Sequence, residues 1–188
     1  MHILHFFPIF ADMKELQWII TEIDSKVASI STDYRHLRSI GAALAELPPE
    51  SIGSVSTHKI STGELAALDL KWEDLRLFGT PFQLKVWKTL FDIPRTRIYS
   101  YSELAALADN PQGVRPVAHA VAINPVAWVI PCHLIVPKET LDKARVIRET
   151  AEKTLFKGQD LYLLDSIDVG EFAYGADIKR ELIKLQLA

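Results

Sequence analysis

The stretch "NPVAWVIPCHLIVP", residues 124–137, decides the fold and function that we expect for this chain. It contains Cys132, the single cysteine among 188 residues, between Pro131 and His133. The thiolate is the reactive form of cysteine, and a neighbouring base favours it. The Cys132–His133 pair is therefore a candidate nucleophile and base. The other interpretation of a lone cysteine is a buried, small apolar residue.

A single cysteine also limits other classes of protein. It forms no internal disulfide and builds no cysteine-rich zinc site, which favours an intracellular protein, in the cytoplasm or, in a eukaryote, the nucleus. A Cys132–His133 hydrolase is disfavoured, because adjacent residues of an extended segment point to opposite sides. No apolar run reaches the ~20 residues of a membrane span. The first residues lack the basic head of a secretory signal.

Two short helices are expected just before this stretch. In "YSYSELAALADNP", Ser100 and Glu103 form a capping box, and "VRPVAHAVAI", residues 114–123, gives a second helix that ends at Asn124-Pro125. Two short helices joined by a tight turn are typical of a helix-turn-helix, whose second helix enters a DNA groove. They are equally typical of a packed pair of helices.

The second helix carries small residues with Arg115 near its start. Ala118, Ala120 and Ala122 would allow close approach to a groove, and Arg115 could reach among the bases. A tightly packed helix with one solvated arginine is the alternative.

The preceding part of the chain mixes expected helices and strands. "ADMKELQWIITEIDSKVASI", residues 11–30, has a helical apolar period with a capping box of Asp12 and Glu15, and a second helix is expected over residues 33–47. Residues 51–78, including "SVSTHKIS" and "LDLKW", favour strands and turns. From residue 80, Thr80, Pro81 and Gln83 predict another helix start.

The charge of the chain is unevenly distributed. The formal net charge is -3, and 24% of the residues are charged. Residues 81–133 carry five basic and three acidic side chains, giving +2, whereas residues 1–80 carry seven and eleven, giving -4. A modest basic field of this kind suffices to approach a phosphate backbone, although a solvated surface shows the same asymmetry often.

These motifs together resemble one family. "PCH" after "NPVAWVI" is similar to the reactive site of the O6-alkylguanine-DNA alkyltransferases (methylated-DNA–protein-cysteine methyltransferases). "GTPFQLKVWKTLFDIP", "YSYSELAALADNP" and "VRPVAHAVAINP" resemble the family's upstream segments, and "VGEFAYGADIKRELIKLQ" resembles its closing helix. The resemblance covers residues 79–137 and 169–186 in the same order, which makes it specific.

The resemblance implies a single-turnover repair reaction. An O6-alkylguanine is flipped out of the duplex, because an atom inside the base stack cannot be reached. Cys132 would be the nucleophile and the acceptor, with His133 as its base through a water. Gln186 stands where the family has the glutamate that holds the histidine. The thioether product is stable, so each molecule would act once, without a cofactor or metal.

Other roles follow from the same resemblance. Tyr101 would crowd the phosphate of the flipped nucleotide and donate toward the leaving guanine, and Arg115 would fill the vacated space. The other expected DNA-facing residues are Ser100, Ala118 and Ala122. The expected pocket residues are Asn124, Ile135, Phe172 and Ala173.

Three departures from the family pattern stand out. Leu134 replaces an arginine, and Gln186 replaces the glutamate, which removes a charge beside His133. Asp160 is a less good match than Gln186 for the position of the family's glutamate. Residues 138–168 are longer than the family's connection and predict an inserted amphipathic helix. These changes leave open a lesion-binding protein that does not transfer the alkyl group.

We therefore expect an α/β (α+β) fold in two parts. A structural domain with a small sheet and helices would span residues 1–78, and a mainly helical, DNA-binding alkyltransferase domain with a helix-turn-helix would span residues 79–188. The expected partner is double-stranded DNA that contains alkylated guanine. The protein is expected to be a monomer without membrane contact.

Overall fold

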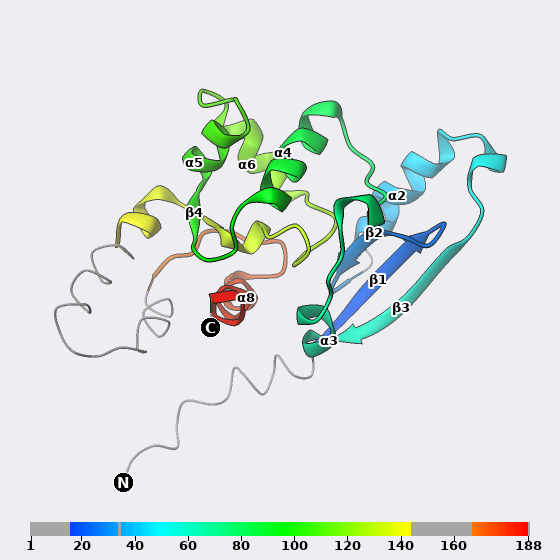
Figure 1. The fold of residues 1–188 in the computed structure, drawn as a ribbon, viewed down its shortest axis with the longest axis horizontal. Coiled ribbons are helices and arrows are strands. Elements are labelled where there is room, and N and C mark those ends of the chain that lie inside the picture. Colours follow the sequence, from blue (N-terminus) through cyan, green and yellow to red (C-terminus); the bar gives the residue numbers. More distant parts are fainter. Residues whose placement is uncertain (1–15, 34, 144–166, 188) are drawn as a thin grey trace, which may run out of the picture. The chain divides into compact units, whose positions relative to one another are not determined.

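The computed structural model describes residues 16–33, 35–143 and 167–187 (Figure 1). The chain forms two compact units. One unit contains the chain up to Phe91 together with Asn124–Ile130, and the other contains Asp92–Ile123 and the chain from Pro131 onward. The boundary that we expect between residues 78 and 79 stays a prediction.

The first unit is built on a three-stranded antiparallel sheet. Its order is β2 (Lys26–Ser31), β1 (Gln17–Ile23) and β3 (Val55–Ser61), with β1 in the centre (Figure 1). The helix expected over residues 11–30 is therefore wrong for the part that the structure describes. Its proposed cap, Asp12 and Glu15, lies outside the described residues.

The physical reason for the β1–β2 hairpin is local. The segment is rich in isoleucine, valine and threonine, which favour strands over helices. Between the strands, Asp24 and Ser25 adopt left-handed φ angles of 53° and 63°, which no helix allows. The Asp24 carboxylate then accepts hydrogen bonds from the backbone nitrogens of Gly53 and Ser54, both at 2.8 Å. These bonds stabilise a turn that helical periodicity does not reveal.

Helices complete the first unit. α2 (Arg35–Ala45) confirms the helix expected over residues 33–47, and α4 (Pro81–Asp92) confirms the start at Thr80, whose hydroxyl accepts from the Gln83 nitrogen at 3.2 Å. α3 (Thr62–Ala66) follows a capping box of Ser61 and Glu64. Short 3-10 turns lie at η1 (Pro49–Ser51) and η2 (Trp72–Asp74). The "LDLKW" stretch is therefore not a strand, and within residues 51–78 the expected strand is β3.

The core of the first unit lies between the sheet and α2. Ile23, Ala28 and Ile40 form a buried cluster, and the buried Trp18 indole donates to the Thr62 hydroxyl at 3.1 Å. The segment 124–130 adds to β2 through hydrogen bonds from the Ile30 nitrogen to Pro125 and from the Ala127 nitrogen to Ile30.

The second unit contains the motif-bearing segments. β4 (Tyr99–Ser100) pairs in parallel with β5 (Ile135–Val136). α5 (Tyr101–Leu107) and α6 (Val114–Ala122) pack together as the expected helix-turn-helix, followed by the 3-10 turn η3 (Cys132–Leu134) and by α8 (Ala176–Leu187) (Figure 1). The apolar cluster that joins these elements consists of Ile98, Leu134, Val136, Leu141, Val169 and Ile183.

The predicted inserted helix is described only at its start. Residues 138–143 are helical, and residues 144–166 of the predicted segment lie outside the described residues. The small N-terminal sheet with helices and the mainly helical second unit confirm the α/β (α+β) class. Among the described residues, no helix is long and apolar enough to cross a membrane.

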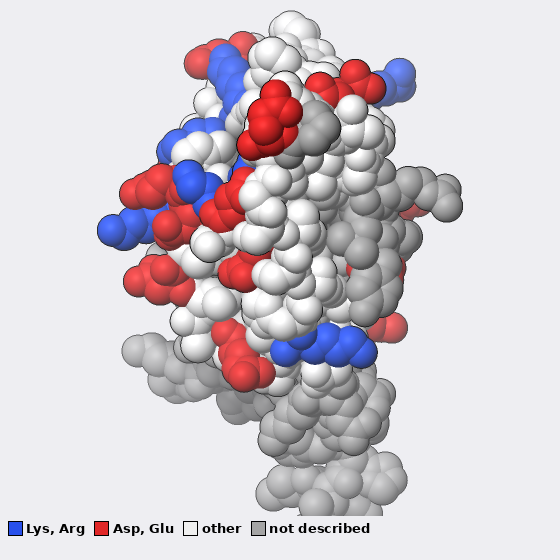
Figure 2. All heavy atoms as spheres, turned by 90° about the vertical axis from the view of Figure 1, so that its right-hand side faces the viewer, with Lys and Arg blue, Asp and Glu red and all other residues white. Residues whose placement is uncertain are grey.

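The surface shown in Figure 2 carries charges of both signs. Asp and Glu side chains lie close to Lys and Arg side chains, with uncharged surface between the groups. On this face the described residues form no continuous basic area, in keeping with the net charge of -3.

Candidate active site around Cys132

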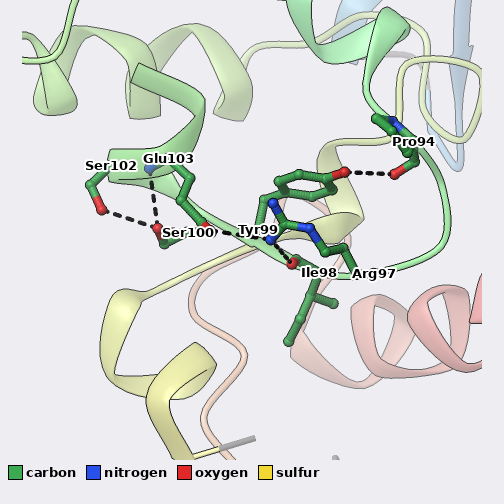
Figure 3. A network of polar contacts seen from close by, with 7 residues as sticks. All are labelled: Pro94, Arg97, Ile98, Tyr99, Ser100, Ser102 and Glu103. Atoms are coloured by element: carbon green, nitrogen blue, oxygen red, sulfur yellow. Dashed lines mark hydrogen bonds and ion pairs between the residues drawn. The ribbon is translucent and has the colours of Figure 1, made fainter. Parts of the chain in front are cut away.

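A polar network fixes the strand that leads into the site (Figure 3). The Arg97 guanidinium lies 3.8 Å from the ring centroid of Tyr99 and forms an ion pair with Glu103 at 3.2 Å. The Tyr99 hydroxyl donates to the Pro94 carbonyl at 3.0 Å. Since Tyr99 pairs with Ile135 in the parallel ladder, the network also fixes the strand that follows η3.

The start of α5 is held by the predicted capping box. The Ser100 hydroxyl accepts from the Glu103 nitrogen at 3.1 Å, and the Glu103 carboxylate accepts from the Ser100 nitrogen at 2.8 Å (Figure 3). Ser100 is buried and occupied by this cap, so its contact with DNA stays a prediction. Tyr101, the first residue of α5, is half-buried, and the cap fixes its backbone.

Cys132 and His133 begin the η3 turn and are both buried. Cys132 is 6% exposed and His133 is fully enclosed. The turn is closed by a hydrogen bond from the Leu134 nitrogen to the Pro131 carbonyl at 3.0 Å. Leu134, the residue that departs from the family arginine, is itself in the apolar cluster of this unit. An apolar residue at this position therefore stabilises the turn by packing.

Helix α8 presents one side to η3. Lys179, Leu182, Ile183 and Gln186 recur at the spacing of a single helical face, and the first three are fully buried. The Gln186 side chain interacts with the His133 imidazole. The Oε1 atom of Gln186 accepts no hydrogen bond among the described residues, so the expected role of residue 186 beside the histidine stays a prediction.

The imidazole of His133 is neutral at ordinary pH. Burial is the main cause that lowers its pKa to about 3. The positive charges of Arg95 and Lys179 lower the pKa further, while the interaction with Gln186 raises it. A neutral imidazole can accept a hydrogen bond from a water or a thiol, but it supplies no positive charge.

The negative charge of a Cys132 thiolate shifts the pKa of two further groups. Burial raises the pKa of Tyr101, and the negative charges of Cys132 and Glu171 raise it further. Burial lowers the pKa of Lys179 to about 8, while the negative charges of Cys132 and Asp168 act in the opposite direction. The Tyr101 hydroxyl therefore stays protonated as a donor, and a cation lies near the sulfur.

Helix α6 has the expected arrangement only in part, because Ala120, expected with Ala118 and Ala122 on the surface that approaches a groove, is buried. Arg115 is exposed near its start, Ala122 is exposed, and Ala118 is half-buried. Val117, Ala120 and Val121 are buried and hold the helix in place. The exposed residues of this helix are thus Arg115, Pro116, His119 and Ala122.

The expected pocket residues lie in both units. Ile135 is buried in β5, Phe172 is half-buried with its ring 5.3 Å from that of Tyr174, and Ala173 is exposed. Asn124 belongs to the first unit, where its amide donates to the Ile130 carbonyl at 2.8 Å and accepts from the Val126 nitrogen at 3.0 Å. Asn124 therefore braces the turn after α6. A role for these four residues in binding guanine stays a prediction.

Three charged residues near the site were missed by sequence reasoning. Arg95, Glu171 and Lys179 all act on the electrostatics of Cys132, His133 or Tyr101. For Lys179 a signal existed, because it lies on the same helical stripe as Leu182 and Ile183. For Arg95 and Glu171 we find no signal in the sequence. Among the described residues, no cluster of histidine, cysteine or acidic side chains could hold a metal ion.

Part of the chain is similar to known DNA methyltransferases. Residues 81–156 match the family model of the 6-O-methylguanine DNA methyltransferase DNA-binding domain. A probable methylated-DNA–protein-cysteine methyltransferase of Acanthamoeba polyphaga mimivirus is 49% identical over 65 residues, which are 35% of this chain and 44% of that protein. A methylated-DNA–protein-cysteine methyltransferase of Kluyveromyces lactis is 48% identical over 60 residues, 32% of each chain. The chain thus matches less than half the length of these relatives.

Solved structures show the same fold over a longer stretch. Mycobacterium tuberculosis OGT in complex with DNA has a TM-score of 0.53 at 20% identity, with 89% of this chain and 85% of that chain covered. The O6-methylguanine methyltransferase of the same organism has a TM-score of 0.52 at 21% identity, with coverages of 87% and 81%. Residues 81–156 of this chain, with the Cys132–His133 turn inside that match, are thus similar to the DNA-binding domain of the 6-O-methylguanine DNA methyltransferases.

Proposed function

We propose that this protein repairs DNA by moving an alkyl group, such as methyl, from O6 of guanine to the sulfur of Cys132. The placement of Cys132 and His133 carries this proposal. Both residues lie on one turn, packed against α8, in the unit that also holds the helix-turn-helix. The K. lactis relative is named for the same transfer to a protein cysteine.

The reaction is a displacement at the alkyl carbon. The Cys132 thiolate forms a new bond from sulfur to carbon, the bond from that carbon to guanine O6 breaks, and the electron pair stays on the guanine. The Tyr101 hydroxyl, kept protonated by burial, donates a hydrogen bond or its proton to the leaving guanine. The thioether is stable, so the protein acts once and needs no cofactor.

His133 assists as a neutral group. Its imidazole accepts a hydrogen bond from the thiol, directly or through a water, and Gln186 orients the ring. Because residue 186 is an amide, little positive charge can build up on the ring. We therefore expect slower thiol deprotonation than a carboxylate at residue 186 would give.

DNA is bound through the helix-turn-helix. In this proposal α6 lies in a groove, Arg115 fills the space of the flipped base, and Ala118 and Ala122 allow close approach. Ser100 lies beside the phosphate at the start of α5. In the second unit, the pocket for the flipped guanine is lined by Ile135, Phe172 and Ala173. Asn124 in the first unit braces the turn after α6. Low net basicity predicts weak, salt-dependent binding to duplex DNA.

Work on DNA also implies where the protein acts. We propose an intracellular monomer, in the cytoplasm or, in a eukaryote, the nucleus. The domain boundary near residue 78 is part of the same proposal, with the N-terminal part in a structural role.

A second candidate is a protein that binds the lesion without transfer. The neutral His133 and the amide at Gln186 favour this candidate, because both reduce the drive for thiol ionisation. The retained cysteine favours transfer, since a binder does not need it.

A duplex with one O6-methylguanine separates the two candidates. Transfer predicts a mass gain of one methylene on the Cys132 peptide and none in Cys132→Ala. The control is the same duplex with unmodified guanine, which should give no adduct. Preferential binding of the methylated duplex without any adduct would overturn transfer and leave the lesion binder.

A further inference from the structure

Lys179 is a buried lysine that the proposed reaction leaves unused. It lies on α8, which packs against the η3 turn, and its residue is fully enclosed. It shares one helical stripe with Leu182, Ile183 and Gln186. From this stripe, the side chain of Gln186 raises the pKa of His133 in η3. Lys179, two turns earlier on the same side, therefore also points toward the site rather than toward solvent.

The Lys179 amine lies near an aromatic ring and a glycine. The nitrogen lies 5.9 Å from the ring centroid of Phe172 and 3.9 Å from the position that a Cβ would take at Gly170. Gly170 has a φ of 76°, and a Cβ at this position would lie 2.9 Å from the ring of Pro137. Burying an ammonium in such a place costs free energy unless an anion compensates.

The other buried lysine of this helix has its own anion. Lys184 is bound by Glu181 at 2.9 Å, and both side chains are buried. Among the residues that the structure describes, no carboxylate lies within the 4.0 Å of an ion pair with Lys179. Asp168, exposed in the segment before α8, interacts with it at longer range.

The charged groups around Lys179 come from three elements. Cys132 and His133 face it from η3, and Asp168 faces it from the preceding segment. Arg95 acts on His133 from the segment before β4. A charged Lys179 stabilises an anion at Cys132 more than one at Asp168. Cys132 and Lys179 are both buried, whereas Asp168 is exposed and its charge is screened by water.

We propose that the Lys179 ammonium holds Cys132 in its thiolate form, the electrostatic role that the neutral His133 does not fill in this chain. The inference deepens the proposed function and rests on it for its biological meaning. Lys179 acts through Cys132 and is thus a positioning residue. The thiol proton leaves to solvent, the sulfur keeps the electron pair, and the cation lowers the free energy of that anion.

The thiol can be tested without DNA. Iodoacetamide reacts with the thiolate, forming a sulfur–carbon bond and releasing iodide, so its rate against pH gives the midpoint of ionisation. In Lys179→Met we expect this midpoint to rise by about one pH unit or more and the rate at pH 7 to fall about tenfold. Lys179→Arg keeps the charge and should keep most of the wild-type rate.

The matched control lies on the same helix. The double variant Lys184→Met/Glu181→Gln removes a buried lysine together with its partner and should leave the midpoint unchanged. Circular dichroism checks that each variant is folded. An unchanged midpoint in folded Lys179→Met, or an equal shift in Lys179→Arg, would overturn the inference.

A reciprocal measurement uses a milder change. By linkage, removal of the thiolate in Cys132→Ser must lower the pKa of Lys179, which NMR of the lysine side chain reports. No change in that pKa would contradict the inference even if Lys179→Met fails to fold. Because neither assay contains guanine, a failure of alkyl transfer from DNA would overturn the proposed function and leave this inference standing.

Discussion

The buried neutral His133 predicts that the fold is sensitive to mild acid. The pKa of this imidazole is about 3 in the folded protein, mainly because of burial, whereas an unfolded histidine titrates near 6.5. Below pH 6.5 the unfolded chain takes up a proton that the folded protein does not, so stability is complete above that pH and falls below it. The replacement His133→Gln removes this titration.

The magnitude follows from the two pKa values. Between the two pKa values, the free energy of unfolding falls by about 1.4 kcal/mol for each pH unit of acidification. For the wild type it should therefore fall by about 2 kcal/mol between pH 7 and pH 5. The free energy of unfolding of His133→Gln at pH 7 differs from that of the wild type, because the substitution disturbs a packed site. Between pH 7 and pH 5, the free energy of unfolding of His133→Gln should therefore fall by about 2 kcal/mol less than that of the wild type.

Urea denaturation at pH 7 and pH 5 measures the difference directly. His119→Gln is the matched control, since His119 is exposed on α6, and it should leave the wild-type loss unchanged. Equal losses in the wild type and in His133→Gln would refute the burial of a neutral imidazole.

Four other substitutions test separate parts of the account. Gln186→Glu places a carboxylate beside the imidazole and should raise the rate of methyl transfer about tenfold, measured in single-turnover kinetics. Arg115→Ala should slow transfer from duplex DNA but leave the reaction with free O6-benzylguanine unchanged. Ser100→Ala removes the cap of α5 and should cost about 1 kcal/mol in urea denaturation. Lys179→Met should raise the free energy of unfolding at pH 7 by up to about 3 kcal/mol, because burial lowers the pKa of the lysine to about 8. This gain in stability should vanish above pH 10, where the lysine is neutral in the folded and the unfolded chain.

Local signals predicted helices in both units. The capping boxes at Ser100 and Thr80 depend on residues three positions apart, so the sequence is sufficient to place α5 and α4. The same signal at Ser61 and Glu64 precedes α3, which was not predicted. The β1–β2 hairpin was not predicted, because Ile19, Ile20 and Ile23 fit a helical period as well as a buried strand. The turn at Asp24 also depends on hydrogen bonds to residues that are distant in the sequence.

The candidate site was predictable in part for a related reason. Cys132 and His133 are adjacent in the sequence, so their pairing needs no knowledge of the fold. The position of Lys179 beside them depends on how α8 packs against η3. The neutral state of His133 depends on burial, which one sequence does not give. Electrostatic partners from distant segments are therefore the part of a site that sequence patterns reveal least.

Counting product per protein molecule tests the central claim most directly. The protein is incubated with an excess of duplex containing O6-methylguanine, and both the repaired guanine and the mass of the Cys132 peptide are followed. The account predicts that repair stops at one equivalent, when every Cys132 carries a methyl group. Repair that continues beyond one equivalent, or a duplex that stays methylated while Cys132 remains free, would contradict it.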